Sequence, residues 1–305
     1  MNSNPLVRPP SSAEIVVVGS CNADLLISGG DIPLPGQTVR AERLERAVGG
    51  KGLNQAVAAA RAGGTVRMLA AIGADADGDH VIEVLENAGV DSALVRRGEV
   101  NTGTAVVTVG RDSDNAISVV GGANATFTHL TLDECAVVRA AAAVVLQLEL
   151  PLPLVTSAAA LARESGALVV LTPAPVAPLP RELLKSVNVL LANRHEALLI
   201  SGAHDLDGAL EVLILSVPTV IVTDGSRGCR WATAGGERGH LAAPAVRAVD
   251  TTGAGDTFAG YLVAGLVQGR GLAESARRAI DAASLSVQRA GGSPSIPLSE
   301  EVNAK

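Results

Sequence analysis

Short, continuously apolar runs alternate with longer Ala-rich or amphipathic segments along most of the chain. The run Glu14–Gly19 is typical of a buried strand, and the Ala-rich segment Asn54–Gly63 is typical of a helix. Val66–Ile72 again predicts a strand, and Asp77–Gly89 predicts a helix that ends at Gly89. The first part of the chain therefore reads as repeated strand–helix units.

The same alternation returns after residue 130. Further strands, with helices between them, are predicted at Val144–Leu148, Leu168–Leu171, Val187–Leu191 and Thr219–Thr223. Strands that are apolar throughout are buried on both faces, and strands that alternate with helices form parallel sheets. We therefore expect an α/β fold with a mostly parallel central sheet flanked by helices on both faces.

Two segments depart from this alternation. Leu25–Val48 places the turn Pro33-Leu-Pro-Gly36 between two half-polar strands, and Thr102–Val120 reads as a hairpin around the turn Gly110–Asn115. Together they predict a small β-sheet that projects from the main domain, with its two parts at about residues 25–48 and 102–120.

Composition narrows the class of protein. The 305 residues allow one large α/β domain or two small ones. Aromatic residues make up 1% of the chain, so the core must consist of Ala, Val, Leu and Ile, and a base-stacking nucleic-acid binder is disfavoured. The net charge of −7 disfavours nonspecific binding to polyanions. No uncharged stretch approaches the roughly 20 residues that span a bilayer.

The ends and the cysteines point to a cytoplasmic protein. Met1–Ser12 is rich in Pro, Ser and Asn and lacks the apolar core of a signal peptide, so we expect a flexible tail followed by one domain over residues 13–305. Cys21, Cys135 and Cys229 are odd in number and form no C-x-x-C pair, which is typical of reduced cysteines. Cys21 adjoins Asn22 and is either a small core residue or part of a site.

The segment from Asp250 to Phe258 carries the strongest chemical signal. Three small residues precede the apolar run Thr257–Val267, which predicts a helix: Gly253, Ala254 and Gly255. Uncovered N–H groups at a helix start make an anion site, and the carboxylate of Asp256 stands within it. A base beside donors that stabilise a transferring anion suits phosphoryl transfer. The alternative is a Gly-rich turn with an Asp N-cap.

Other motifs accompany this segment in a fixed order. They are Gly19-Ser-Cys-Asn22-Ala-Asp24, Pro33-Leu-Pro-Gly36, Gly49-Gly50-Lys51-Gly52-Leu-Asn54-Gln-Ala, Gly121-Gly-Ala-Asn124, Gln147-Leu-Glu149, Pro173-Ala-Pro, Asn193-Arg-His-Glu196 and Thr223-Asp-Gly225-Ser-Arg-Gly228. Together they resemble the ribokinase branch of the PfkB carbohydrate kinases from about Glu14 to about Pro297. The blocks Gly49–Ala56 and Asp250–Phe258 match the two signature regions of that family, in the same order.

The residues themselves favour a sugar site near the first strand. Asn22 and Asp24 follow that strand at its carboxyl end, where open α/β sheets bind ligands, and their spacing puts both on one side. Amides and carboxylates of this kind recognise hydroxyl groups. The resemblance implies sugar contacts at Asn22, Asp24, Gly50, Lys51, Asn54, Glu149 and Asp256. It also implies that Asp256 is the base and that the three small residues before it stabilise the transferring phosphoryl group.

The nucleotide is expected further along the chain. The resemblance implies nucleotide contacts at Asn193, Thr223, Gly225, Ser226, Gly228 and Gly255. Asn193 and Glu196 stand three residues apart at a helix start, which aims both at one point, and in the family Glu196 would order Mg²⁺ largely through water. The chain departs from the family pattern at Arg194, Asp224 and Ile280. Arg194 either contacts phosphate or is solvated, and Ile280 would make the adenine contact apolar.

The resemblance further implies a monovalent cation, K⁺, beside the anion site. The matching positions are Asp250, Thr252, Ser286, Arg289, Gly291 and Ser295. A plain helix C-terminus at Arg289–Gly292 explains the last group nearly as well. In the family, the small sheet is a lid over the sugar and pairs with its copy in a homodimer.

The expected activity is therefore the ATP-dependent phosphorylation of D-ribose at the 5-hydroxyl, giving D-ribose 5-phosphate and ADP. No nucleic-acid or membrane partner is expected. Two alternatives stay open. One is a sister kinase acting on deoxyribose, a nucleoside or a hexose derivative, and the other is a non-catalytic sugar-binding regulator on the same scaffold. The spacing of Asn22 and Asp24, with the block at Gly49–Ala56, favours ribose.

Overall fold

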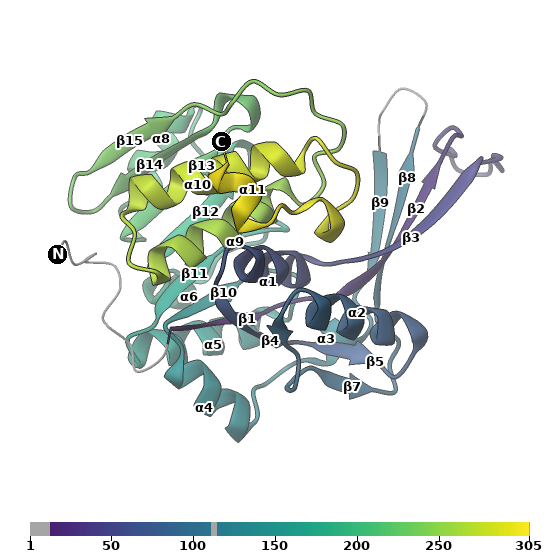
Figure 1. The fold of residues 1–305 in the computed structure, drawn as a ribbon, viewed down its shortest axis with the longest axis horizontal. Helices are drawn as coiled ribbons and strands as arrows, with labels where there is room; N and C mark the ends of the chain where they lie inside the picture. The colour runs from purple at the N-terminus through teal and green to yellow at the C-terminus, as the bar shows by residue number, and fades with distance from the viewer. Residues whose placement is uncertain (1–12, 111–114, 305) are drawn as a thin grey trace.

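A large sheet forms the centre of the molecule, in a computed structural model that describes residues 13–110 and 115–304 (Figure 1). The predicted tail over residues 1–12 and most of the predicted turn Gly110–Asn115 lie outside the described residues. The strand order is β15-β14-β13-β12-β11-β10-β1-β4-β6. The strands are β1 (Glu14–Val18), β4 (Thr65–Leu69), β6 (Val90–Asp91), β10 (Ala143–Leu146), β11 (Leu168–Leu171), β12 (Val189–Asn193), β13 (Thr219–Thr223), β14 (Cys229–Thr233) and β15 (Arg238–Leu241).

The pairing within this sheet confirms the predicted α/β architecture. All neighbours from β6 to β13 run parallel, whereas β14 and β15 add an antiparallel edge. Because side chains alternate across a strand, Ile15 and Val17 of β1 enter one core, and Val16 and Val18 enter the other. Both faces of the sheet are therefore covered.

Two groups of helices bury the two faces. One core receives α1 (Lys51–Arg61), α2 (Ala76–Asn87), α9 (Ala254–Val267), α10 (Leu272–Ser286) and α11 (Ser299–Asn303). The other receives α3 (Ala123–Thr126), α4 (Leu132–Ala140), α5 (Leu152–Glu164), α6 (Arg181–Ser186), α7 (Arg194–Ser201) and α8 (Leu206–Leu213). Short 3₁₀ turns occur at Gly225–Arg227 (η1) and Ser293–Ser295 (η2).

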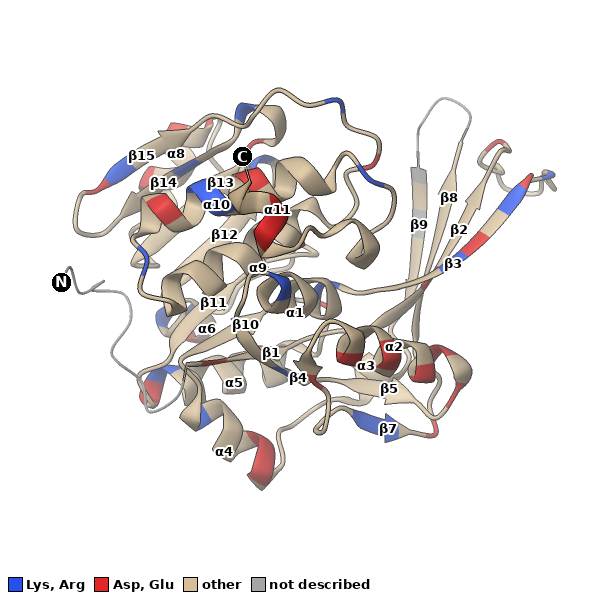
Figure 2. Ribbon diagram, viewed as in Figure 1, with Lys and Arg blue, Asp and Glu red and all other residues tan. Residues whose placement is uncertain are grey.

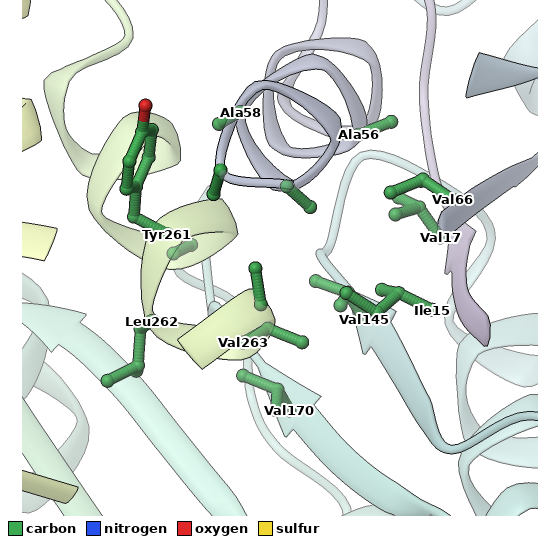
Figure 3. Packing of buried hydrophobic residues seen from close by; sticks show 14 of the residues in the cluster. Ile15, Val17, Ala56, Ala58, Val66, Val145, Val170, Tyr261, Leu262 and Val263 are labelled. Atoms are coloured by element: carbon green, nitrogen blue, oxygen red, sulfur yellow. The ribbon is translucent and has the colours of Figure 1, made fainter. Parts of the chain in front are cut away.

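Helices α1 and α9 pack closely, and Figure 3 shows Ala58 of α1 on the side facing Tyr261 of α9. A Cβ on Gly260 would lie 2.4 Å from Cβ of Ala58 and 2.7 Å from the carbonyl oxygen of Gln55, so only glycine fits there. The abundance of small residues predicted from the sequence therefore has a specific use. It brings the first turns of the two helices together at the carboxyl edge of the sheet.

The small sheet is also confirmed, and we call it the lid. Its order is β3-β2-β8-β9, formed by β2 (Asn22–Ser28), β3 (Arg43–Gly49), β8 (Gly103–Val109) and β9 (Asn115–Val120). It projects from the main domain in Figure 1. Its charged residues gather on β3 (Figure 2), whereas β8 and β9 carry none, and Val119 and Val120 are exposed. A separate parallel pair is formed by β5 (Ala71–Gly73) and β7 (Arg96–Gly98).

Several predicted boundaries are wrong. Helix α1 begins at Lys51, before the predicted Asn54, and β10 ends at Leu146, before the predicted Leu148. The strand predicted at Val66–Ile72 is two strands, because the Ala70 carbonyl accepts a hydrogen bond from Arg96 N–H and the chain there passes from β4 to β5. The strand predicted at Val187–Leu191 begins at Val189, since Val187 caps α6. Helix α9 begins at Ala254 and not at the predicted Thr257, so Asp256 lies within its first turn.

The antiparallel edge holds the one tryptophan of the sequence. Trp231 on β14 is almost fully buried, and its indole N–H donates to Glu237. A Cβ on Gly239 would lie 1.9 Å from the ring, so the facing strand needs glycine. Within residues 13–110 and 115–304, no helix combines the length and the hydropathy needed to cross a membrane.

Candidate active site

The carboxylate of Asp256 is the centre of the site. It lies in the first turn of α9 and is 8% exposed. Asn54 donates to its Oδ2 over 3.3 Å and Gln55 donates to its Oδ1 over 2.8 Å, both from the first turns of α1. Burial raises the pKa of Asp256, while the charge of Lys51 and the hydrogen bond from Gln55 oppose the rise. A carboxylate with a raised pKa and fixed donors is suited to accept a proton.

The helix start beside Asp256 is shaped by Gly253. This residue is the N-cap of α9 and has φ of 72°, a left-handed conformation that glycine adopts without strain. A Cβ on Gly255 would meet no atom within 4 Å, so the helix end is open on that side. Of the three N–H groups expected to hold an anion, that of Ala254 donates to the Thr251 carbonyl over 3.2 Å. The N–H groups of Gly253 and Gly255 can therefore still donate to a phosphoryl group.

Lys51 and Glu149 lie on the other side of the site. Glu149 Oε2 accepts hydrogen bonds from the Lys51 backbone N–H, at 2.9 Å, and from the Ser20 hydroxyl. The nearby charge of Asp256 raises the pKa of the Lys51 ammonium, although burial opposes this rise. The side chain of Lys51 therefore stays cationic near the carboxylates, as a contact to a hydroxyl or phosphate oxygen requires.

Asp24 and Asn22 stand at the root of the lid, on β2. The carboxylate of Asp24 covers Gly49, where a Cβ would lie 2.1 Å from Oδ2, so glycine is required opposite it. Burial, with a further contribution from the charge of Glu149, raises the pKa of Asp24 to about 6. Asn22 Oδ1 accepts from Asn124 Nδ2 at 2.8 Å, and Asn124 also binds the backbone of Cys21 on both sides.

Cys21 is therefore a core residue and not part of the site surface. It is fully buried, and burial raises the pKa of its thiol. Cys229 is likewise buried with a pKa raised to about 12, and all three cysteines are free thiols. This agrees with the expectation of reduced, structural cysteines.

A pocket of about 210 Å³ lies beside Asp256, and of the predicted sugar-contacting residues only Lys51 and Asp256 line it. Its lining is Lys51, Thr172, Ala174, Leu191, Ala192, Asn193, Glu196, Thr223, Thr251, Gly253, Gly255 and Asp256. The base, the helix start and the predicted magnesium residue thus face one space, although they come from α1, β12, α7 and α9. The carboxyl ends of parallel strands meet there, which is where the sequence placed the ligands.

A larger pocket of about 700 Å³ adjoins this space. Five of the six predicted nucleotide residues line it: Thr223, Gly225, Ser226, Gly228 and Gly255. Asn193 lines the smaller pocket instead. The remaining wall is mostly apolar and comes from residues 243–248 and from Phe258, Ile280, Ala283 and Val287, with Arg247, Thr251 and Ser284 as its polar members. The predicted apolar role of Ile280 thus agrees with its position.

Asn193 and Glu196 are bound to each other. The Asn193 side chain accepts from Glu196 N–H, and Glu196 Oε2 accepts from Asn193 N–H, both at 2.9 Å, as a reciprocal cap on α7. This leaves Glu196 Oε1 for a ligand. Among the described residues, no group of three or more His, Cys, Asp or Glu side chains could hold a metal. One carboxylate oxygen fits Mg²⁺ held mainly by water and phosphate, and Asn193 and Glu196 are the residues that would hold it.

The side chain of Arg194 is exposed and does not line the smaller pocket. Its guanidinium lies 3.2 Å from Asp224, whose carboxylate also accepts two hydrogen bonds from Arg227. The hydrogen bonds from Arg227 and the nearby charge of Arg194 hold the pKa of Asp224 below its ordinary value. The two departures from the family pattern, Arg194 and Asp224, therefore compensate each other.

The predicted cation residues are brought together only in part. Asp250 accepts from the N–H groups of Thr252, at 2.9 Å, and Gly291, at 2.8 Å. Burial opposes its ionisation, but these bonds outweigh it and hold the pKa below the ordinary value. The hydroxyl groups of Ser286 and Ser295 donate to carbonyls within their own turns, and the Arg289 side chain pairs with Glu301. Only backbone oxygens there are suited to a K⁺ site.

Several polar residues near the site carried no distinct signal in the sequence. They are Ser20, Gln55, Asn124, Gln147 and Thr172. Four of them stand inside the quoted motifs and Thr172 directly precedes Pro173-Ala-Pro, so their position offered a hint. Their contacts join segments about 100 to 200 residues apart, which a single sequence does not reveal.

Comparison with known proteins gives a consistent result. Residues 12–298 match the pfkB family of carbohydrate kinases. The chain is 37% identical to the ribokinase of Staphylococcus aureus, over 95% of this chain and 98% of that protein. It is 32% identical to the deoxyribokinase of Salmonella typhi, over 95% and 97%. The structure of Arabidopsis thaliana ribokinase complexed with ribose and ATP superposes with a TM-score of 0.90 at 33% identity, covering 97% of this chain and 98% of that chain.

Proposed function

Because this chain belongs to the PfkB family of carbohydrate kinases, we propose that it transfers the terminal phosphoryl group of ATP to the 5-hydroxyl of D-ribose. The products are D-ribose 5-phosphate and ADP. The observation that carries this proposal is the position of Asp256. Its carboxylate lies in the first turn of α9, within the pocket that the helix start and Lys51 also line.

The chemistry follows from that geometry. Asp256 accepts the proton of the sugar hydroxyl, which makes the oxygen a better nucleophile. The open helix start at Gly253 and Gly255 stabilises the charge of the transferring phosphoryl group, and Lys51 adds a positive charge beside it. The sugar lies toward Asn22, Asp24, Asn54 and Glu149, and the adenine lies in the apolar pocket beside Ile280.

Two ions are part of the proposal. Bound Mg²⁺ supplies positive charge to the ATP phosphates, and Asn193 and Glu196 would hold it through water. Backbone oxygens near Asp250 and Gly291 would hold K⁺, which strengthens the anion site beside it. Asp250 holds that loop closed through its bonds to Thr252 and Gly291.

Assembly and location complete the proposal. The lid presents an uncharged pair of strands with exposed Val119 and Val120, and a second copy of the same sheet would cover them. We therefore infer a homodimer that forms through the lid, and a cytoplasmic enzyme with free thiols. Lid closure over ribose excludes water from the reaction.

The direct test is ADP release measured by a coupled assay after adding ribose to the protein with MgATP. Ribose-dependent ADP release is expected, and kcat/KM should be highest for D-ribose in a panel with deoxyribose, nucleosides and hexose derivatives. A higher kcat/KM for deoxyribose would favour the sister kinase, to which the chain is also similar. Ribose binding without ADP release would indicate a sugar-binding regulator.

A further inference from the structure

Two buried glutamines, Gln147 and Gln55, are linked to Asp256 by consecutive hydrogen bonds. Gln147 Nε2 donates to Gln55 Oε1 over 2.7 Å, and Gln55 Nε2 donates to Asp256 Oδ1 over 2.8 Å. Both glutamines are 1% exposed. The second hydrogen of Gln55 Nε2 goes to the hydroxyl of Thr172 at 3.0 Å. Both polar atoms of the Gln55 side chain therefore make hydrogen bonds within the protein. Gln55 does not line the pocket beside Asp256.

The charge of Asp256 sets the direction of these hydrogen bonds. An ionised carboxylate only accepts hydrogen bonds, so Gln55 must turn its NH₂ group toward it. The Gln55 oxygen then faces Gln147, which must donate its own NH₂ group. The Thr172 hydroxyl imposes no direction, because it accepts from Gln55 and donates to the Leu146 carbonyl. Asp256 thus selects the orientation of the Gln55 amide, and Gln147 supplies the donor that the Gln55 oxygen then needs.

We propose that Gln55 is a positioning residue for the base, and that Gln147 holds the Gln55 side chain in place by donating to its oxygen. The pair keeps a donor on Oδ1 of Asp256 and leaves Oδ2, which has only the 3.3 Å contact from Asn54, to receive the substrate proton. This proposal rests on the proposed function, in which Asp256 is the base. It adds two residues that contact neither sugar nor nucleotide.

The packing of α1 against α9 supports this role. A Cβ on Gly260 would lie 2.7 Å from the Gln55 carbonyl oxygen, so glycine at this position lets α9 pack directly against the backbone of Gln55. A glutamine needed only to fill this space would be replaced by methionine with little effect. Two buried amides cost desolvation, which their hydrogen bonds offset only in part, because Gln147 Oε1 has no hydrogen-bond partner among the described residues.

The test compares Gln55→Met with the matched control Gln268→Met. Gln268 lies at the opposite end of the α1–α9 contact and binds the Ala62 and Gly63 carbonyls. Loss of one donor to a charged group predicts a fall in kcat of roughly 10-fold for Gln55→Met, with KM for ribose within about threefold. The acidic limb of kcat/KM should move to higher pH by about half a unit to one unit, because ionised Asp256 loses a donor. The control should keep the wild-type pH profile.

Gln147→Met tests the second link without touching Asp256 directly. This variant should move the acidic limb of the kcat/KM profile to higher pH, but by less than Gln55→Met does. The double variant should show no shift beyond that of Gln55→Met alone. An unchanged pH limb in a folded Gln55→Met protein, or additive shifts in the double variant, would overturn the proposal. If Gln55→Met does not fold, as judged by its melting temperature, the limb of Gln147→Met decides alone.

A measurement without substrate separates this proposal from the proposed function. The pKa of Asp256 is followed through its carboxyl ¹³C signal in the ligand-free protein, assigned by Asp256→Asn. A higher pKa in Gln55→Met than in wild type supports the role of Gln55 even if ribose is not the substrate. An unchanged pKa in an enzyme that phosphorylates ribose would overturn the positioning role while leaving the kinase activity intact.

Discussion

Glu149, on the loop after β10, accepts a hydrogen bond at 2.9 Å from the backbone N–H of Lys51, at the start of α1. The two residues are 98 positions apart, and the bond uses one of the N–H groups that a helix start leaves without a partner. The Glu149 carboxylate binds Ser20 as well as Lys51, and its charge contributes to the raised pKa of Asp24.

Asp256→Asn keeps the shape of the base but removes its ability to accept a proton. We expect kcat to fall by roughly 10²–10⁴, the usual range for loss of a general base, with ribose affinity changed much less. Steady-state kinetics and calorimetric ribose binding measure the two effects. A variant that retains kcat within threefold of wild type would show that Asp256 is not the base.

Asp24→Ala should weaken ribose binding by about 1.5–3 kcal/mol, the scale of a hydrogen bond to a charged group. ATP affinity should be unchanged, since Asp24 lies at the root of the lid and away from the nucleotide pocket. Calorimetry with each ligand provides the comparison. Equal losses for ribose and ATP would indicate a structural role for this carboxylate.

Asp24 also predicts a pH dependence of stability. Its pKa is raised to about 6 in the folded protein, so between about pH 4 and pH 6 the folded chain holds a proton that the unfolded chain, with the ordinary pKa of 3.8, has already released. Ionisation of Asp24 therefore destabilises the fold above about pH 6, and this cost disappears below about pH 4. Asp24→Asn should raise the free energy of unfolding at pH 7 and give no gain at pH 3.5. Urea unfolding at both pH values tests this, and equal gains at the two would contradict it.

Gly260→Ala should destabilise the protein, because its Cβ would lie 2.4 Å from Cβ of Ala58. Overpacking of this kind costs about 1–3 kcal/mol, against a gain of up to about 1 kcal/mol in helix propensity. We also expect kcat to fall, since the helices carry Gln55 and Asp256. Gly98→Ala is the matched control, because nothing lies within 4 Å of its added Cβ. Similar melting temperatures for the two variants would argue against the close contact.

The proposed homodimer and lid closure have separate measurements. Light scattering at micromolar concentration should give twice the 30.7 kDa mass of one chain, and a monomer mass would refute the dimer. Val119→Asp and Val120→Asp, as separate variants, test the two faces of β9, and the charge on the dimer face should shift the protein toward monomer. Without ribose, ATP hydrolysis should be a small fraction of the ribose-dependent rate. Comparable rates would show that the lid does not exclude water.

The fold was predictable where one local pattern decides the structure. The apolar runs at Leu168–Leu171 and Thr219–Thr223 are strands with the predicted bounds, because buried parallel strands are apolar throughout. The break between β4 and β5 was not predictable, since the apolar run continues through Ala70 and only its bond from Arg96 turns the chain into another sheet.

The candidate site shows the same limit. Asp256 was recognisable because its small neighbours at a helix start have a chemical meaning of their own. Gln55 was not, although it stands inside a quoted motif. A polar residue in an Ala-rich helix has the same sequence pattern whether it faces water or a buried carboxylate 201 positions away. Only the tertiary packing of α1 on α9 distinguishes the two.

The tight fit of Trp231 against Gly239 has an optical consequence. The sequence contains one tryptophan, so its tryptophan fluorescence comes from a single buried indole at the antiparallel edge of the sheet. That edge continues from β13, whose last residue lines the nucleotide pocket, and it lies at the opposite end of the molecule from the lid (Figure 1). The tryptophan emission of the native protein therefore reports on the edge of the sheet next to the nucleotide pocket. A fluorescence measurement of the lid requires a fluorophore attached to the lid.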